Sequence, residues 1–137
     1  GAEEAAIRYG KHLQAFFDGG SPAFDLHILG MGTDGHTASL FPGKADALTE
    51  EKHRAVATSH DNHPHDRITM TPWAISAARQ VVVMVSGRKK ANMLHRVIEG
   101  PHQPTLYPIQ AIQPQTGLAW YVDQAAASQL GPALETS

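Results

Sequence analysis

The chain has 137 residues, 42% of them hydrophobic and 18% charged, which is the length and composition of one globular domain with its own core. Its 11 basic and 13 acidic residues give a net charge of −2, which argues against a broad nucleic-acid surface. No apolar run approaches the ~20 residues of a membrane span. The absence of cysteine excludes disulfides, thiolate metal sites and a cysteine nucleophile. We therefore expect one cytoplasmic domain over residues 1–137, with neither nucleic acid nor a membrane as partner.

The first half of the chain predicts a helix and two strands. Residues 2–17 place apolar side chains at helical spacing, and the segment 18–22 ends this helix with glycine and proline. Residues 24–29 are predicted to form a strand that runs into a glycine-rich loop. A weaker strand is predicted over residues 54–58, and the polar segment 59–66 is predicted to be a loop.

The second half alternates helices and strands. Thr71 and Pro72 combine a hydroxyl N-cap with proline at the first helical position, so a helix should begin there. The uninterrupted apolar run 81–85 predicts a strand covered on both faces, as in a parallel sheet. The predicted elements are a helix over 72–78, a strand over 81–85, a helix over 88–99, an extended connection over 101–114, a strand over 118–122 and a final helix capped by Asp123 and reaching Leu130. This alternation predicts an α/β domain with a mainly parallel sheet flanked by helices.

The loop after the first predicted strand satisfies the spacing G-x-G-x-x-G through Gly30, Gly32 and Gly35. In dinucleotide-binding folds a long helix follows this spacing, and an acidic residue ends a second strand about 20 residues further on. Here the Pro-Gly pair at 42–43 stops any helix early, and no predicted strand leads to the glutamates at 50–51. The sequence therefore argues against a dinucleotide cofactor.

The same loop carries the side chains of an acid–base site. Asp34 and His36 bracket Gly35, with Thr37 and Ser39 beside them. A histidine at the end of a strand, with a carboxylate within reach, can act as a general base near neutral pH. The alternative is that Asp34 caps a short helix and His36 only fills space, and the residues alone leave both interpretations open.

A resemblance to a known family favours the acid–base interpretation. Residues 34–42, read after the strand and loop at 24–32, resemble the motif of the 6-phosphogluconolactonase family. Further segments resemble the family in the same order, namely residues 67–71, 85–91, 113–117 and 120–127. The sister family, the glucosamine-6-phosphate deaminases, shares the Asp-Gly-His core but usually continues with Ile-Ala-Phe-Asn-Glu-Pro. This chain has Thr-Ala-Ser-Leu-Phe-Pro at residues 37–42, which favours the lactonase family.

The resemblance implies a fold, an activity and a set of site residues. The fold would be Rossmann-like with three layers, of the NagB/RpiA type. The activity would be hydrolysis of 6-phosphogluconolactone to 6-phosphogluconate in the pentose phosphate pathway, with a small phosphorylated sugar lactone as partner and no metal or cofactor. The catalytic residues would be His36 as general base and Asp34, and the substrate-binding residues would be Gly32, Gly35, Thr37, Arg67 and Lys90, with Arg67 and Lys90 at the phosphate.

The resemblance also implies that the chain corresponds to the C-terminal part of the family fold. Family members normally carry a further N-terminal portion with a glycine- and serine-rich phosphate loop and an Asp-Glu-Arg-type segment, and nothing in this chain matches either. We therefore expect an incomplete fold, impaired turnover, and self-association through an exposed sheet edge.

Other readings remain open beside the lactonase. His60, His63, His65 and Asp66 are metal-ligand types, but their spacing is not a strong zinc pattern, so we expect a polar loop and no metal site. A phosphosugar-binding module without catalysis could share the fold, since fold alone does not determine function. A glucosamine-6-phosphate deaminase-like enzyme is the third reading.

Overall fold

The computed structural model describes residues 1–17 and 24–132. Its α-helices and strands are α1 (Ala2–Phe16), β1 (Leu26–Leu29), α2 (Ala45–Leu48), β2 (Ala55–His60), β3 (His63–Met70), α3 (Pro72–Ser76), β4 (Gln80–Val85), α4 (Ala91–Glu99) and β5 (Leu118–Val122). Short 3₁₀ helices are η1 (Arg88–Lys90), η2 (Pro108–Ala111) and η3 (Ala126–Gln129). Within the described ranges no helix is long and apolar enough to cross a membrane.

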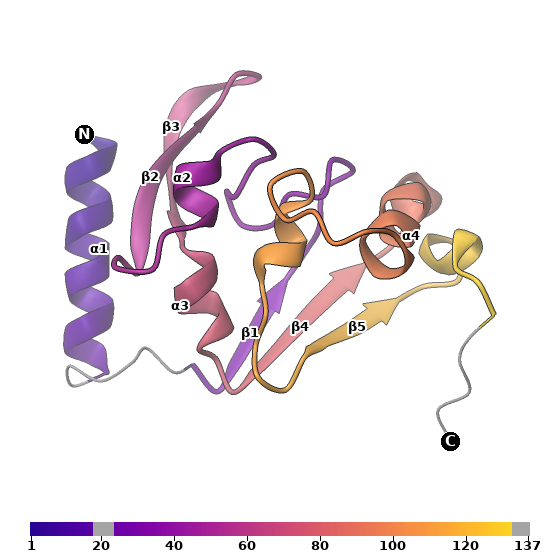
Figure 1. Ribbon diagram of the computed structural model, residues 1–137. Coiled ribbons are helices and arrows are strands. Elements are labelled where there is room, and N and C mark those ends of the chain that lie inside the picture. Colours follow the sequence, from indigo (N-terminus) through magenta and orange to yellow (C-terminus); the bar gives the residue numbers. More distant parts are fainter. Residues whose placement is uncertain (18–23, 133–137) are drawn as a thin grey trace.

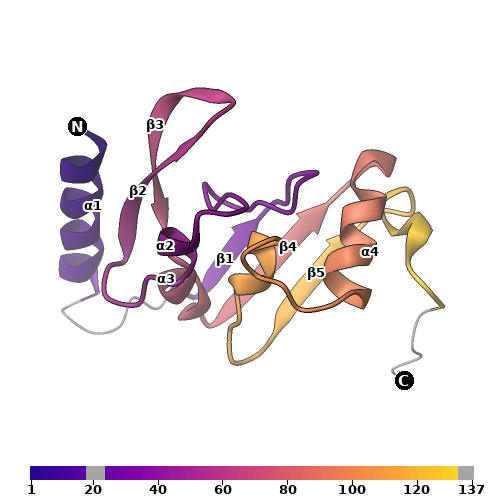
Figure 2. The same cartoon turned by 45° about the horizontal axis from the view of Figure 1, so that its top comes forward.

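Three strands form a parallel sheet in the order β1-β4-β5. Figure 1 shows α1 and the β2–β3 hairpin at one end of the molecule, the sheet in the middle and α4 at the other end. In Figure 2 the three strands lie side by side and point to the same edge. The expected α/β class with a parallel sheet flanked by helices is confirmed, and the carboxyl ends of β1 and β4 are neighbours at the edge where ligands collect in such folds.

One face of the sheet carries the hydrophobic core. Side chains of a strand alternate between faces, so every second residue of the apolar run at 81–85 points into this core. The buried core includes Leu29, Val81, Val83 and Val85 from the sheet and Ile75, Leu94, Ile109 and Ile112 from the segments that cover it. Burying one such side chain stabilises the fold by roughly 1.5–3 kcal/mol.

The opposite face of the sheet is largely open to solvent in the described part of the chain, although Val82 on this face is buried. Ile28, Met84 and Tyr121 point to this face and are 58%, 57% and 61% exposed. The prediction that residues 81–85 are covered on both faces was therefore wrong for Met84. A continuous apolar run shows that both faces of a strand could be buried, not that both are. In the described residues, helices cover one face only.

The segment predicted as a polar loop, residues 59–66, is part of an antiparallel hairpin. Strands β2 and β3 pair from Ala55 opposite Met70 to His60 opposite His63, with an irregularity between Thr58 and His60. The loop prediction was wrong because backbone hydrogen bonds form a ladder whatever the side-chain polarity. Much of β3 is exposed, so it tolerates polar residues. Helix α1 lies along this hairpin (Figure 1).

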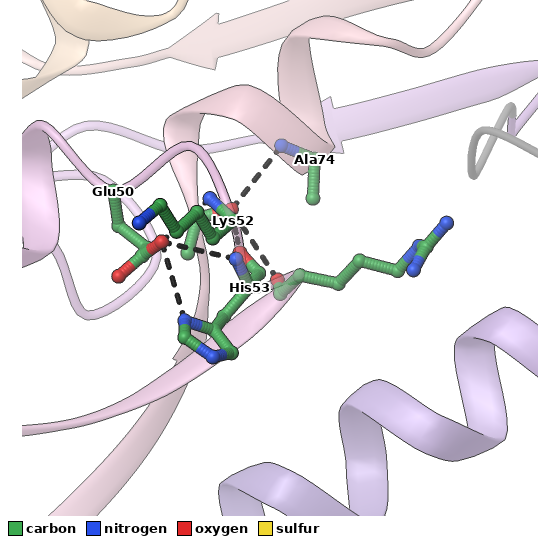
Figure 3. A network of polar contacts seen from close by, with 6 residues as sticks. Glu50, Lys52, His53 and Ala74 are labelled. Atoms are coloured by element: carbon green, nitrogen blue, oxygen red, sulfur yellow. Dashed lines mark hydrogen bonds and ion pairs between the residues drawn. The ribbon is translucent and has the colours of Figure 1, made fainter.

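A polar network fixes the start of β2 against the start of α3. The Thr71 hydroxyl accepts a hydrogen bond from the Ala74 N–H (3.2 Å), so the predicted N-cap is confirmed, and it donates to the His53 carbonyl (2.9 Å). The Glu50 carboxylate accepts from the backbone N–H groups of Lys52 (2.6 Å) and His53 (3.0 Å). Figure 3 shows these contacts, which join the hairpin to the helix beside the core.

The C-terminal elements are shorter than predicted. The helix expected over 88–99 begins as the 3₁₀ turn η1 before α4, and the connection over 101–114 contains η2. The predicted cap is confirmed only in part: the Asp123 carboxylate accepts from the Ala126 N–H (2.8 Å), but the N-cap of η3 is Ala125, and η3 ends at Gln129. The Gly-Pro pair at 131–132 follows, which accounts for the early end.

Candidate active site

The loop after β1 is closed on itself by hydrogen bonds. The Gly32 N–H donates to the His36 carbonyl (2.8 Å), and the Gly35 N–H donates to the Gly32 carbonyl (3.0 Å). The buried hydroxyl of Thr37 donates to the Gly30 carbonyl (2.8 Å). These bonds hold His36 at the mouth of the loop on a backbone with little freedom.

Two glycines of the G-x-G-x-x-G spacing serve the Asp-His pair. A Cβ on Gly32 would lie 2.2 Å from His36 Nδ1 and 2.7 Å from Asp34 Oδ1, so only glycine leaves room for both side chains. Gly35 has φ +84°, and an added Cβ would lie 3.4 Å from the Tyr107 backbone. The chain then makes turns rather than a helix before α2, so the helix of a dinucleotide site is missing from these described residues.

Asp34 and His36 form a hydrogen-bonded pair. His36 Nδ1 lies 2.5 Å from Asp34 Oδ1, and the His36 backbone N–H donates to the same oxygen (3.1 Å). Partial burial raises the pKa of the Asp34 carboxyl, but the hydrogen bonds and the charge interaction with His36 outweigh it, so the pKa lies below its ordinary value. An ionised Asp34 favours the imidazole tautomer with its proton on Nδ1, which leaves the Nε2 lone pair available to accept a proton.

The pair opens onto a pocket of about 300 Å³ at the carboxyl ends of β1 and β4. The pocket is lined by Gly30, Met31, Gly32, His36, Thr37, Ala38 and Lys90. The Lys90 ammonium donates to the Met31 carbonyl, across 59 positions of sequence. Of the residues predicted for the site, Gly32, His36, Thr37 and Lys90 line this pocket, while Asp34 is hydrogen-bonded to His36 and Gly35 lies in the same loop.

Arg67 lies elsewhere in this structure. It sits on β3 opposite Thr58, its side chain is exposed, and it does not line the pocket. The structure therefore does not bring Arg67 together with Lys90, although both come from segments that resemble the same family.

Two contacts that the sequence analysis missed join the hairpin to the site. The Phe41 ring lies 5.3 Å from the ring of His36 and 4.6 Å from that of His60, measured between centroids. The Thr69 hydroxyl, buried on β3, accepts from the Ser39 N–H (3.2 Å). Ser39 and Phe41 belong to the motif at 34–42, which extends well beyond the Asp-Gly-His core. That extension was the sequence signal that further residues hold the loop in place.

A larger hollow, of about 510 Å³, lies between the start of α1 and the hairpin. Its charged groups are the carboxylates of Glu3, Glu4 and Asp66 and the ammonium of Gly1, so the carboxylates outnumber the cation and disfavour a phosphorylated ligand. The smaller pocket is lined by both His36 and Lys90, so it is the candidate site for an anionic ligand.

No three metal-ligating side chains lie close enough to hold an ion among the side chains that the structure describes. The side chain of His63 lies outside them, so the set of His60, His63, His65 and Asp66 is described only in part. His60 Nδ1 accepts a hydrogen bond from the Asn62 N–H (3.1 Å) and its ring packs on Phe41.

Comparisons with known proteins agree over most of the chain. Residues 1–120 match the family described as glucosamine-6-phosphate isomerases/6-phosphogluconolactonase. A human 6-phosphogluconolactonase is 44% identical over 132 residues, which cover 93% of this chain and 50% of the relative. The chain thus spans about half the length of the curated relatives it matches.

Solved structures agree with the sequence comparison. A crystal structure of the devB protein has a TM-score of 0.85 at 30% identity, over 96% of this chain and 56% of that one. The 6-phosphogluconolactonase from Trypanosoma brucei has a TM-score of 0.76 at 28% identity, over 95% of this chain and 54% of that one. The similarity therefore covers the sheet, the loop after β1 and the turn that carries Lys90.

Proposed function

The chain belongs to the glucosamine-6-phosphate isomerase/6-phosphogluconolactonase family, and on this premise we propose that it hydrolyses 6-phosphogluconolactone to 6-phosphogluconate. It would act as a carboxylic ester hydrolase of the pentose phosphate pathway, without a metal or cofactor. One observation carries the proposal: His36, hydrogen-bonded to Asp34, lines the same pocket as Lys90. A base and a cation in one pocket suit an ester that also bears a phosphate.

In the proposed reaction His36 is the general base. Nε2 takes a proton from water as the oxygen attacks the lactone carbonyl carbon, and Asp34 stabilises the imidazolium that forms. The tetrahedral intermediate then collapses, the bond between the carbonyl carbon and the ring oxygen breaks, and the imidazolium returns the proton to the leaving oxygen. One hydrogen of the water thus ends on the carboxylic acid of the open-chain product, and the other ends on its new hydroxyl group.

Lys90 is proposed to bind the phosphate. It is the last residue of η1 and directly precedes α4, so its positive charge adds to the partial positive charge of that helix end. Gly32, Gly35 and Thr37 are proposed to shape the substrate site through the loop backbone. Arg67 is proposed as a second phosphate ligand, which requires the hairpin to bring its side chain closer when substrate binds.

The test compares lactone hydrolysis by the chain, by its His36→Ala variant and by a full-length relative, with isothermal calorimetry of 6-phosphogluconate binding alongside. We expect a measurable rate below that of the full-length relative, lost in His36→Ala while binding persists. Binding with no rate in either protein would identify a phosphosugar-binding module. Turnover of glucosamine 6-phosphate in place of the lactone would identify a deaminase-like enzyme.

We further propose that the chain associates with a second copy of itself. Support comes from the sheet, where β1 and β5 each pair on one side only among the described residues. Ile28, Met84 and Tyr121 are exposed on one face of it. Unpaired strand edges beside apolar surface favour contact between chains.

The cytoplasm is the proposed location. The support is that the sequence has no cysteine, since disulfides are typical of small proteins in oxidising compartments. Fractionation of cells that express the chain tests this proposal.

A further inference from the structure

The turn between β4 and η1 leads the chain to Lys90, the last residue of η1. Gly87 has φ +93° and begins this turn, and its carbonyl accepts from the Lys90 N–H (3.2 Å). No residue of η1 is buried, and a Cβ on Gly87 would meet nothing within 4 Å. Glycine can adopt many backbone conformations, so a contact that restrains Gly87 also restrains the turn that follows it.

That restraint comes from the end of β5. Both carboxylate oxygens of Asp123 accept from the Gly87 N–H, at 3.1 and 3.2 Å, across 36 positions of sequence. The Asp123 N–H donates to the Val85 carbonyl (3.3 Å), which fixes Asp123 beside the end of β4. The carboxylate also accepts from the Ala126 N–H at the start of η3 (2.8 Å), so it is held from both sides.

We infer that Asp123 is a positioning residue for Lys90: by holding the Gly87 N–H it fixes the turn from which the ammonium reaches the Met31 carbonyl and the pocket. The geometric part of this inference stands on the hydrogen bonds alone. Its consequence for ligand affinity rests on the proposed function, in which Lys90 binds phosphate. Removal of the carboxylate should release Lys90 without touching His36.

The geometric part can be tested by amine labelling followed by mass spectrometry, with the neighbouring exposed Lys89 as internal reference. In the unchanged chain Lys90 should react at least about tenfold more slowly than Lys89, because a hydrogen bond made by a charged group is stronger than one between neutral groups. In Asp123→Ala the two rates should become similar. Asp123→Asn, which keeps one oxygen acceptor, should give an intermediate ratio and serves also if the alanine variant unfolds.

Glu99→Ala is the matched control. The Glu99 carboxylate also accepts from a glycine N–H of the C-terminal segment, that of Gly131 (2.6 Å), but at the other end of α4. Glu99→Ala should leave the labelling rate of Lys90 relative to Lys89 unchanged. General loosening of the C-terminal segment would instead alter this ratio in both Glu99→Ala and Asp123→Ala. A wild-type ratio in both folded Asp123 variants would overturn the inference, and so would an equal change in Glu99→Ala.

Calorimetry with 6-phosphogluconate tests the consequence for binding. Asp123→Ala should raise Kd about tenfold, and it should add little to the effect of Lys90→Ala, because residues that act through one contact are not additive. Full additivity would overturn the link between the two residues. If the unchanged chain does not bind 6-phosphogluconate, the proposed function fails, while the labelling ratio still decides whether Asp123 positions Lys90.

Discussion

The exchange of Gly32 for alanine is the sharpest test of the Asp-His pair. The new Cβ would lie 2.2 Å from both Nδ1 and Cε1 of His36 and 2.7 Å from Asp34 Oδ1. Non-bonded carbon contacts are comfortable at about 3.5–4.0 Å, so the imidazole must move by about an ångström or more. A displacement of about 1 Å at a catalytic group costs on the order of 100-fold in rate. We therefore expect Gly32→Ala to lower kcat by about that factor.

Two measurements separate this effect from unfolding. Lactone hydrolysis gives the rate, and proton NMR follows the downfield signal expected for the Nδ1–H proton shared between His36 and Asp34, which should disappear. Gly10→Ala is the control, since a Cβ at Gly10 in α1 meets nothing within 4 Å and alanine favours a helix. If Gly32→Ala keeps both the rate and the downfield proton, the account of this glycine is wrong.

Three further predictions concern pH, loop support and association. Partial burial raises the pKa of Asp34 but hydrogen bonds and the charge interaction with His36 lower it more. The ionised form therefore stabilises the fold at neutral pH, and this contribution is lost as the pH falls through the lowered pKa. The free energy of unfolding of the chain should thus fall more steeply below about pH 4 than that of Asp34→Asn, and parallel denaturation curves would contradict this. Thr69→Val should lower the free energy of unfolding, measured in urea, by about 1 kcal/mol, because the Ser39 N–H loses its acceptor. Thr69→Ser keeps a hydroxyl and should retain most of the stability, and equal stabilities of the two variants would refute the role of the hydroxyl. Met84→Lys should weaken self-association in analytical ultracentrifugation without lowering the melting temperature, because Met84 is exposed on the open sheet face; unchanged sedimentation would show that this face is not the contact.

The elements that the sequence predicted well are those with a local cause. The N-cap at Thr71 and the apolar run at 81–85 each carry their signal within a few residues, and both elements appear where expected. The hairpin at 55–70 was only half predicted, since its second strand is polar and is held by backbone pairing with a partner that no local pattern identifies. The open face at Met84 was also beyond local reasoning, because it depends on which helices reach that face.

The contacts of the candidate site also fall into two groups, those with a local sequence signal and those without one. Asp34 and His36 are two positions apart, so their contact follows from the motif and the glycines around it. The packing of Phe41 between His36 and His60 joins the loop to β2, and nothing in the spacing of these residues predicts it. Nor does local pattern reveal the bond from Asp123 to Gly87, although the sequence predicted a role for the same carboxylate at the start of the last helix.

Topology explains why Lys90 lies in the same pocket as His36. In the parallel register Leu29 lies opposite Val83, so the loop after β1 and the turn after β4 must emerge side by side at one edge of the sheet. Any residue in the first turns after those strands is a candidate neighbour, and the sequence identifies both strands. Arg67 enters from a separate hairpin whose position relative to the sheet follows from no such rule. The sheet therefore determines the contact of Lys90 with the loop, whereas an approach of Arg67 to the pocket depends on how the hairpin packs against that loop.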